Sequence, residues 1–93
     1  MAFPRAPAHD PDDVAIQALS FLAADPERLE RFMALSGLTP ETLRAAANGS
    51  GFLVAVLEHV LADESLVLAF AANAGLAPER IAAARAALAG VGG

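Results

Sequence analysis

Cysteine is absent from this 93-residue sequence, and so are lysine, tryptophan and tyrosine. Without cysteine the chain has no disulfide, no thiolate nucleophile and no cysteine-ligated metal. Its six positive charges are arginines spread along the sequence, and the formal net charge is -5. This pattern counts against nucleic-acid binding, because affinity for the phosphate backbone depends on clustered Lys and Arg.

The composition that remains favours a small, folded, helical protein. Hydrophobic residues make up 56% of the chain and charged residues 18%, a balance unlike that of disordered segments. The length fits one domain with one modest core. Alanine accounts for 24 residues, and β-branched residues are few, so the local preference is for helix rather than strand. We expect a single all-α domain.

Long uninterrupted apolar segments are also lacking. Residues 1–11 contain no continuous apolar stretch of the kind that a secretory signal needs. The most apolar region, residues 52–77, is interrupted by charged and polar residues, namely Glu58, His59, Asp63 and Glu64. A membrane-spanning helix requires about 20 nearly uncharged residues. We therefore interpret this region as two buried helices, expect no membrane association, and expect a cytoplasmic location.

Helix start and stop signals divide the chain into six short helices. Asp-Pro pairs begin the first two, Thr39-Pro40 begins the third, and glycines follow several of the ends. The expected helices cover residues 11–24, 26–36, 40–48, 52–62, 64–74 and 78–89. Gly90 is expected to end the last one. We predict one helical domain at residues 12–89, with flexible tails at residues 1–11 and 90–93.

An internal repeat appears when the sequence is shifted by 38 residues against itself. The aligned pairs are a capping acid, an apolar anchor, a terminating glycine and a helix-starting proline: Asp25 with Asp63, Phe32 with Phe70, Gly37 with Gly75, and Pro40 with Pro78. Two units are fewer than a stacked solenoid needs. The repeat predicts a compact bundle of about six short helices, built from two similar three-helix units.

The two units differ in one informative respect. The second helix carries Arg28 and Glu30, whereas the fifth has Leu66 and Leu68 at the matching positions. A helix that is apolar nearly all round is either central to the fold or half of an interface. If these leucines are exposed, they should form a surface for a protein partner or a homodimer, together with fourth-helix neighbours. The candidate surface consists of Phe52, Val56, Leu66 and Leu68.

Candidates for chemistry are few. His59 and Asp63 have i,i+4 spacing and Glu58 adjoins them, so a metal-ligand or acid/base site can be drawn. The other histidine, His9, lies near the N-terminus, and we interpret His59 as a surface residue near a helix end. We interpret the acids around Asp12 as helix caps. No catalytic residue, metal ligand or cofactor-binding residue is predicted.

Two motifs that would bind phosphate or DNA are incomplete in this sequence. The Gly49-Ser50-Gly51 turn is not followed by lysine, so the phosphate-loop pattern is absent. Residues 40–62 could be drawn as a helix-turn-helix, but the second helix begins with an apolar run that starts at Phe52. Reading base edges needs polar side chains there.

Several segments resemble a small alphaproteobacterial family of uncharacterised proteins, domain of unknown function 3572. The resemblance covers about residues 12–89, and its most specific segment is Ala-Asp-Glu-Ser-Leu, residues 62–66. Asp25-Pro26-Glu27 and the Gly-Leu pairs at residues 37–38 and 75–76 also match. The resemblance implies no assigned activity, so it identifies no functional residue.

Three hypotheses follow from the sequence. The first is a non-enzymatic helical interaction or regulatory module that presents apolar surface from its fourth and fifth helices to a protein partner. The second is a small-ligand binder or enzyme with a pocket between the two repeat units that uses His59 and Glu58. The third, nucleic-acid binding, is disfavoured by the acidic charge and the scattered arginines.

Overall fold

A computed structural model describes residues 10–39, 41–42, 45 and 50–91 of the chain. In this part of the chain the structure is all-helical and contains no strand. It has five helices, which are α1 (Pro11–Ala23), α2 (Pro26–Ser36), α4 (Ser50–Leu61), α5 (Glu64–Ala74) and α6 (Pro78–Val91). The fold class predicted from composition is thus confirmed, at the level of an all-α architecture.

The predicted third helix falls mostly outside the described residues. Within it, Glu41, Thr42 and Ala45 are helical. Its start is fixed by reciprocal hydrogen bonds: the Thr42 N–H donates to Thr39 Oγ1 (3.2 Å) and the Thr39 N–H donates to Thr42 Oγ1 (2.7 Å). This exchange resembles a capping box. The predicted end near Asn48 lies outside the described residues.

Two equivalent aspartates cap α2 and α5. Asp25 Oδ1 accepts the Glu27 N–H at 3.0 Å, and Asp63 Oδ1 accepts the Ser65 N–H at 2.9 Å. Asp63 also accepts the Leu66 N–H at 3.4 Å. These bonds satisfy backbone donors that have no partner inside the helix. The prediction that both helices begin at a capping aspartate is confirmed.

The glycine stops were predicted correctly at two positions and wrongly at a third. Gly37 and Gly75 follow α2 and α5 with φ of 78° and 71°, a left-handed conformation that glycine adopts without a Cβ penalty. Gly90, in contrast, lies inside α6, which continues to Val91. The Asp-Pro pair at the start of α1 was expected to supply a side-chain cap, and this is wrong for Asp10, whose side chain makes no capping hydrogen bond.

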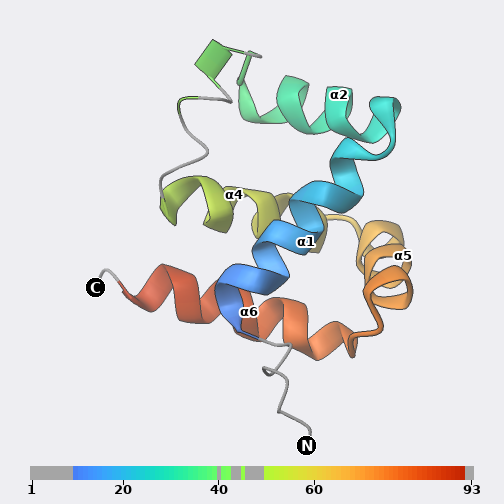
Figure 1. Cartoon of the computed structure of the whole chain (residues 1–93), viewed down its shortest axis with the longest axis vertical. Helices are drawn as coiled ribbons and strands as arrows, with labels where there is room; N and C mark the ends of the chain where they lie inside the picture. Colours follow the sequence, from blue (N-terminus) through green and yellow to red (C-terminus); the bar gives the residue numbers. More distant parts are fainter. Residues whose placement is uncertain (1–9, 40, 43–44, 46–49, 92–93) are drawn as a thin grey trace, which may run out of the picture.

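The centre of the fold is formed by α1, α4 and α6, which pack against one another (Figure 1). Their fully buried side chains include Leu22 from α1, Leu57 from α4 and Ile81 from α6. α2 and α5 lie at the periphery of this group, α2 at the top and α5 at the right of Figure 1. α5 is therefore not the central helix that its wide apolar arc could have indicated.

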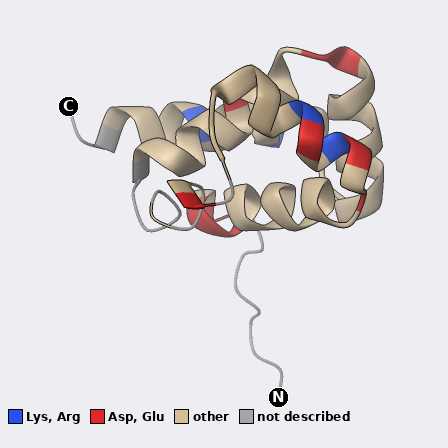
Figure 2. Ribbon diagram, turned by 90° about the horizontal axis from the view of Figure 1, so that it is seen from above, with Lys and Arg blue, Asp and Glu red and all other residues tan. Residues whose placement is uncertain are grey.

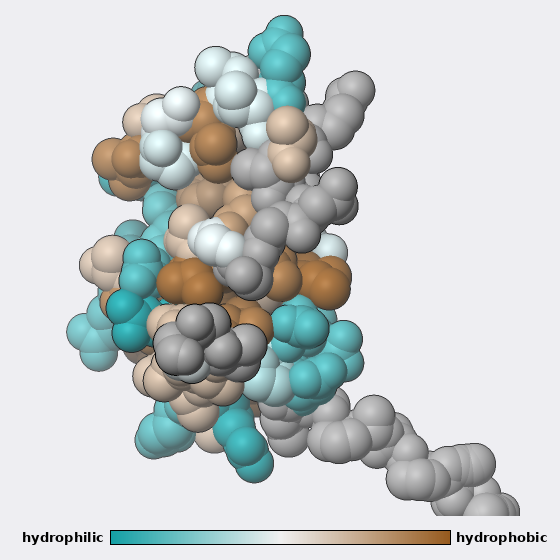
Figure 3. All heavy atoms as spheres, turned by 90° about the vertical axis from the view of Figure 1, so that its left-hand side faces the viewer, coloured by the Kyte–Doolittle hydropathy of each residue, from teal (hydrophilic) through white to brown (hydrophobic). Residues whose placement is uncertain are grey.

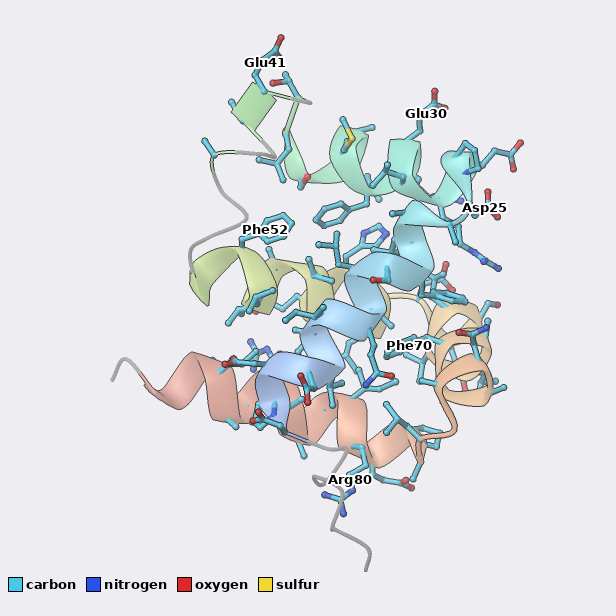
Figure 4. The ribbon with its side chains drawn as sticks, viewed as in Figure 1. Asp25, Glu30, Glu41, Phe52, Phe70 and Arg80 are labelled. Carbon is cyan, nitrogen blue, oxygen red and sulfur yellow. The ribbon has the colours of Figure 1, made fainter. Side chains whose placement is uncertain are left out.

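Phenylalanines attach both peripheral helices to the centre. Phe32 of α2 and Phe70 of α5 are both buried, at 1% and 0% exposure, as their equivalence in the repeat predicts. Phe70 points from α5 towards α1, and Phe52 lies between α4 and α2 (Figure 4). The Phe32 and Phe52 rings meet edge to face at 6.1 Å. Each peripheral helix therefore contributes an aromatic ring to the shared core.

No single helix in the described ranges is long and apolar enough to cross a membrane. α5 and α6 together reach the length and apolarity of a span, but the chain bends by 100° between them.

Candidate functional site

The partner surface expected from the sequence does not lie on the outside of the molecule. Phe52, Val56 and Leu66 are buried in the core, and of the four expected residues only Leu68 is exposed, at 55%. Phe52 is covered because it packs against Phe32 of α2. The prediction that these four side chains form one surface is therefore wrong.

Large exposed hydrophobic side chains lie on three different helices. They are Leu35 on α2, Leu68 on α5 and Ile16 on α1, with exposures of 71%, 55% and 50%. Figure 3 shows one side of the molecule, where hydrophobic residues gather near the middle and hydrophilic ones flank them. Single exposed hydrophobic residues are common on protein surfaces. An exposed residue that borders a hollow is more informative, and Ile16 is such a residue.

Ile16 borders a shallow groove between α1 and α5. The groove has a volume of about 700 Å³. Ile16 and Gln17 contribute to it from α1, and Phe70 and Asn73 from α5. Because positions 16, 17, 20 and 24 recur every three to four residues, they share one face of α1. The groove follows that face, with an aliphatic rim and two amide side chains.

Phe21 joins Phe70 in the lining of this groove. The two ring centroids are 5.5 Å apart and the planes are tilted by 50°. The guanidinium carbon of Arg28 lies 4.5 Å from the Phe21 centroid, and Arg28 Nη1 is 3.7 Å from Asp25 Oδ2. Arg28 and Asp25 also line the groove. The groove therefore combines aromatic and aliphatic surface with a charged pair at the start of α2.

A second hollow, the charged cleft, separates α2 from the corner between α4 and α5. It encloses about 320 Å³. Acidic and basic residues alternate along α2 (Figure 2), and those that line the cleft are Glu27, Arg28 and Arg31. Asp63 and Ser65 line it from the other side. The Asp63 carboxylate already accepts backbone N–H groups of α5, so its Oδ1 atom is engaged in capping that helix.

His59 lies in the wall of the charged cleft and is half-buried. Its ring meets Phe32 edge to face, with centroids 5.1 Å apart. Its Nε2 atom is buried and has no hydrogen-bond partner among the described residues. Burial lowers the pKa of His59 below its usual value of 6.5, Arg31 lowers it further by charge repulsion, and Asp63 opposes both effects. His59 thus lies near a helix end, in the last turn of α4, as predicted, but its ring packs against Phe32 instead of lying free on the surface.

Glu58 and His59 both line a third hollow, of about 320 Å³, between α2 and α4. Its other walls include Phe32 and Leu35. The Glu58 carboxylate accepts the Nη2–H of Arg85 at 2.7 Å and its Nε–H at 3.2 Å, so Glu58 is already paired with α6. General acid/base catalysis needs a group free to exchange its proton with a substrate. The pocket hypothesis thus retains a hollow and one imidazole, but its carboxylate is engaged.

The described residues contain no group of three His, Asp or Glu side chains placed to hold a metal ion. His59 and Asp63 have the spacing of a ligand pair, but Asp63 caps α5. The pair therefore contributes to helix structure and to the electrostatics of the imidazole.

Sequence reasoning missed the α1–α5 groove. Its walls come from helices that are about 50 residues apart in the sequence, and their relative placement depends on the tertiary packing of α1. One local signal was present: Ile16 interrupts the polar face of α1 between Asp13 and Gln17. An isolated isoleucine carries too little information to predict a groove.

One family model matches nearly the whole chain. It is described as "Protein of unknown function (DUF3572)" and covers residues 8–91. No curated protein and no solved structure matches the chain. The matched range includes all five described helices, both capping aspartates and the groove. The chain therefore belongs to the DUF3572 family.

Proposed function

We propose that the protein is a non-enzymatic, cytoplasmic interaction module that binds a protein partner in the α1–α5 groove. The observation that carries this proposal is the open groove of about 700 Å³ in which the half-buried Phe21 lies beside the half-exposed Ile16, above the buried ring of Phe70. Apolar surface that borders a hollow and is rimmed by polar groups is typical of interaction sites.

The shape of the groove suits an amphipathic helix. Its α1 wall extends from Ile16 to the cap residue Ala24, and this span rises by roughly 12 Å, just over two turns. A partner helix buries apolar residues at positions i, i+3, i+4 and i+7 in such a groove. The amide groups of Gln17 and Asn73 can then bond polar atoms along the edges of that helix.

Charge complementarity favours a partner with basic residues beside its apolar stripe. Asp12 and Asp13 are exposed in the first turn of α1, and Asp13 precedes Gln17 by one helical turn. The Asp25–Arg28 pair at the other end of the α1 wall is balanced, and the whole chain has a net charge of -5. A helix flanked by Lys or Arg is attracted by the resulting negative potential, which strengthens binding and accelerates association.

Site-specific photo-crosslinking in the native cell tests the proposal. A photoreactive amino acid replaces Gln17 or Asn73 in the groove, or Leu68 as a control that is exposed but does not line it. We expect both groove positions to crosslink to the same protein, and Leu68 to give no such adduct. Ile16→Glu should reduce the adduct at Asn73, while Leu68→Glu should not.

Two results contradict the proposal. Equal crosslinking at Leu68 and at the groove positions means that the partner does not bind specifically in the groove. An adduct with twice the mass of the chain identifies a second copy as the occupant, in place of a basic partner helix. Circular dichroism of each variant ensures that a lost adduct does not reflect unfolding.

The complete architecture is also part of our proposal. We infer six helices in two similar units, and the support is that α2 and α5 share a capping aspartate, a buried phenylalanine and a left-handed glycine. Backbone ¹³C chemical shifts of residues 40–48 test the inferred third helix. Helical shifts throughout this segment support six helices, and coil shifts contradict them.

A further inference from the structure

One buried ring of α2 holds this helix against α4. Among its eleven residues, all of them described, Phe32 is the only one that is buried. Leu29 and Met33 pack beside it and remain partly exposed. The neighbours of α2 are α1 and α4, and it packs less extensively against α4 than against α1. The contact of Phe32 with α4 therefore decides whether α2 stays closed over that helix.

The α4 side of this contact is formed by two rings. The Phe32 centroid lies 6.1 Å from that of Phe52 and 5.1 Å from that of His59, and both interplanar angles are 70°. The imidazole therefore forms part of the aromatic surface against which α2 rests. The chemical state of His59 therefore bears directly on the anchor of α2.

Protonation changes that contact. An imidazolium ion carries hydrogen on both ring nitrogens, and Nε2 of His59 is buried without an acceptor among the described residues. A buried N–H without an acceptor destabilises the state that contains it. The closed arrangement therefore favours the neutral ring.

The charged groups around His59 come from every element that borders it. Arg31 of α2 opposes protonation and Asp63 at the start of α5 favours it. The remaining charged residues in the two hollows that His59 lines are Asp25, Glu27 and Arg28 on the α2 side and Glu58 on α4. Asp25 and Arg28 pair with each other, and Glu58 pairs with Arg85. Of the charged residues, Arg31 and Asp63 are the ones that shift the pKa of His59, and burial adds to the effect of Arg31.

We propose that His59 is a pH-sensitive latch: the neutral imidazole holds α2 closed over α4, and the protonated imidazole releases it. Release turns Phe32 out of its contact and uncovers Phe52, which creates an apolar surface on α4 at acidic pH. This surface is distinct from the α1–α5 groove. The device goes beyond the proposed interaction function, and each can hold without the other.

The direction of the effect follows from proton linkage. In the closed state the pKa of His59 is lowered, mainly by burial, and in the open state it returns towards 6.5 because the ring is hydrated. The open state then binds the proton more tightly, so its population rises as the pH falls below about 6.5. Each unit of difference in pKa multiplies the open-to-closed ratio by about ten once the pH lies below both values.

Hydrogen exchange of the full chain tests the latch between pH 7.5 and 5.0, a range above the usual carboxylate pKa values of about 4. The variant His9→Gln leaves His59 as the single imidazole, so its ring signals report its titration directly. We expect protection factors at residues 29–36 of α2 to fall as the pH falls, and the midpoint of this fall should match that of the His59 titration. Protection factors in α6 should remain unchanged. Parallel loss of protection in α2 and α6 means global unfolding and overturns the proposal.

Two variants separate the latch from a general acid effect. His59→Phe retains an aromatic ring that cannot titrate, so α2 should stay protected down to pH 5.0. Arg31→Gln removes a charge that lowers the pKa of His59, so the midpoint should move to higher pH. The proposal is overturned if α2 loses protection equally in folded His59→Phe, or if Arg31→Gln leaves the midpoint unchanged. If His59→Phe fails to fold, the midpoint measured for Arg31→Gln decides whether the latch is correct.

Discussion

The guanidinium group of Arg28 lies over the ring of Phe21, with its central carbon 4.5 Å from the ring centroid. This contact joins α2 to α1, and Arg28 also pairs with the capping residue Asp25 at 3.7 Å. Cation–π contacts at partly exposed sites contribute about 0.5–1 kcal/mol. The exposed ion pair adds little, because solvent screens it.

The first prediction concerns this contact. Arg28→Gln should lower the free energy of unfolding by about 0.5–1 kcal/mol, since it removes the cation while retaining most of the side-chain length. Arg31→Gln is the matched control at neutral pH, because Arg31 makes no ion pair or ring contact among the described residues. Urea denaturation at pH 7.5 measures both. Equal losses in the two variants contradict a specific role for the Phe21 contact.

The second prediction concerns the helix caps. Asp63→Ala should destabilise the protein by about 0.5–2 kcal/mol, and Asp25→Ala by a similar amount, because each leaves backbone N–H groups without an acceptor. Asp10→Ala is the internal control, since the Asp10 side chain makes no such bond. Thermal melts should rank Asp10→Ala close to the parent protein. A loss at Asp10 as large as at Asp63 disproves the capping explanation.

The third prediction concerns the apolar arc of α5. Leu66→Arg should destabilise the domain strongly, because it replaces a core leucine, 9% exposed, with a charged side chain at the edge of the charged cleft. Leu68→Glu should stay within about 0.5 kcal/mol of the parent protein, as substitutions on the surface usually do. Thermal melts of the two purified variants, followed by circular dichroism, distinguish the positions. A Leu66→Arg protein as stable as the parent protein contradicts the burial of Leu66.

The fourth prediction uses the two phenylalanine anchors. Phe32→Ala and Phe70→Ala should each cost about 3–5 kcal/mol, the range for large truncations in a core. A small domain has only about 5–15 kcal/mol of total stability, so both variants should be only marginally folded at 37 °C. Calorimetry provides the comparison. Unchanged melting of either variant is incompatible with its burial.

The fifth prediction tests the left-handed glycine. Gly37→Ala should cost about 1–2 kcal/mol, because alanine pays a steric penalty at positive φ. A Cβ at Gly37 meets nothing within 4 Å, so the penalty is conformational and does not arise from a clash. Gly51→Ala in α4, where a Cβ also has open space, should be neutral or slightly stabilising. Denaturation midpoints that fall equally in both variants argue against the backbone explanation.

Local features of this protein were predictable because their causes are local. Asp25 and Asp63 cap helices through bonds to N–H groups two and three residues away, and Gly37 ends a helix through its own φ. Gly90 is also a glycine, yet α6 continues through it. Glycine permits the left-handed conformation but does not require it.

The candidate sites were not predictable for a geometric reason. Leu66 and Leu68 are two positions apart, which turns them by about 200° around the helix, so one is buried and the other faces solvent. The sequence shows that both are leucine but not which side of α5 meets α1. The environment of His59 likewise depends on Phe32, a residue 27 positions earlier that arrives through the fold.

The packing of α1 against α6 has a consequence for how the chain folds during synthesis. These helices occupy opposite ends of the described chain, and both are required for the central group with α4. α6 is also the last of the described helices to be synthesised, so α1 and α4 are made before the last wall of the core exists. At about 5–20 residues per second, the synthesis of its 14 residues takes roughly one to three seconds. During that time the apolar faces of α1 and α4 lack their partner in α6, and the core can close only after residues 78–91 have been made.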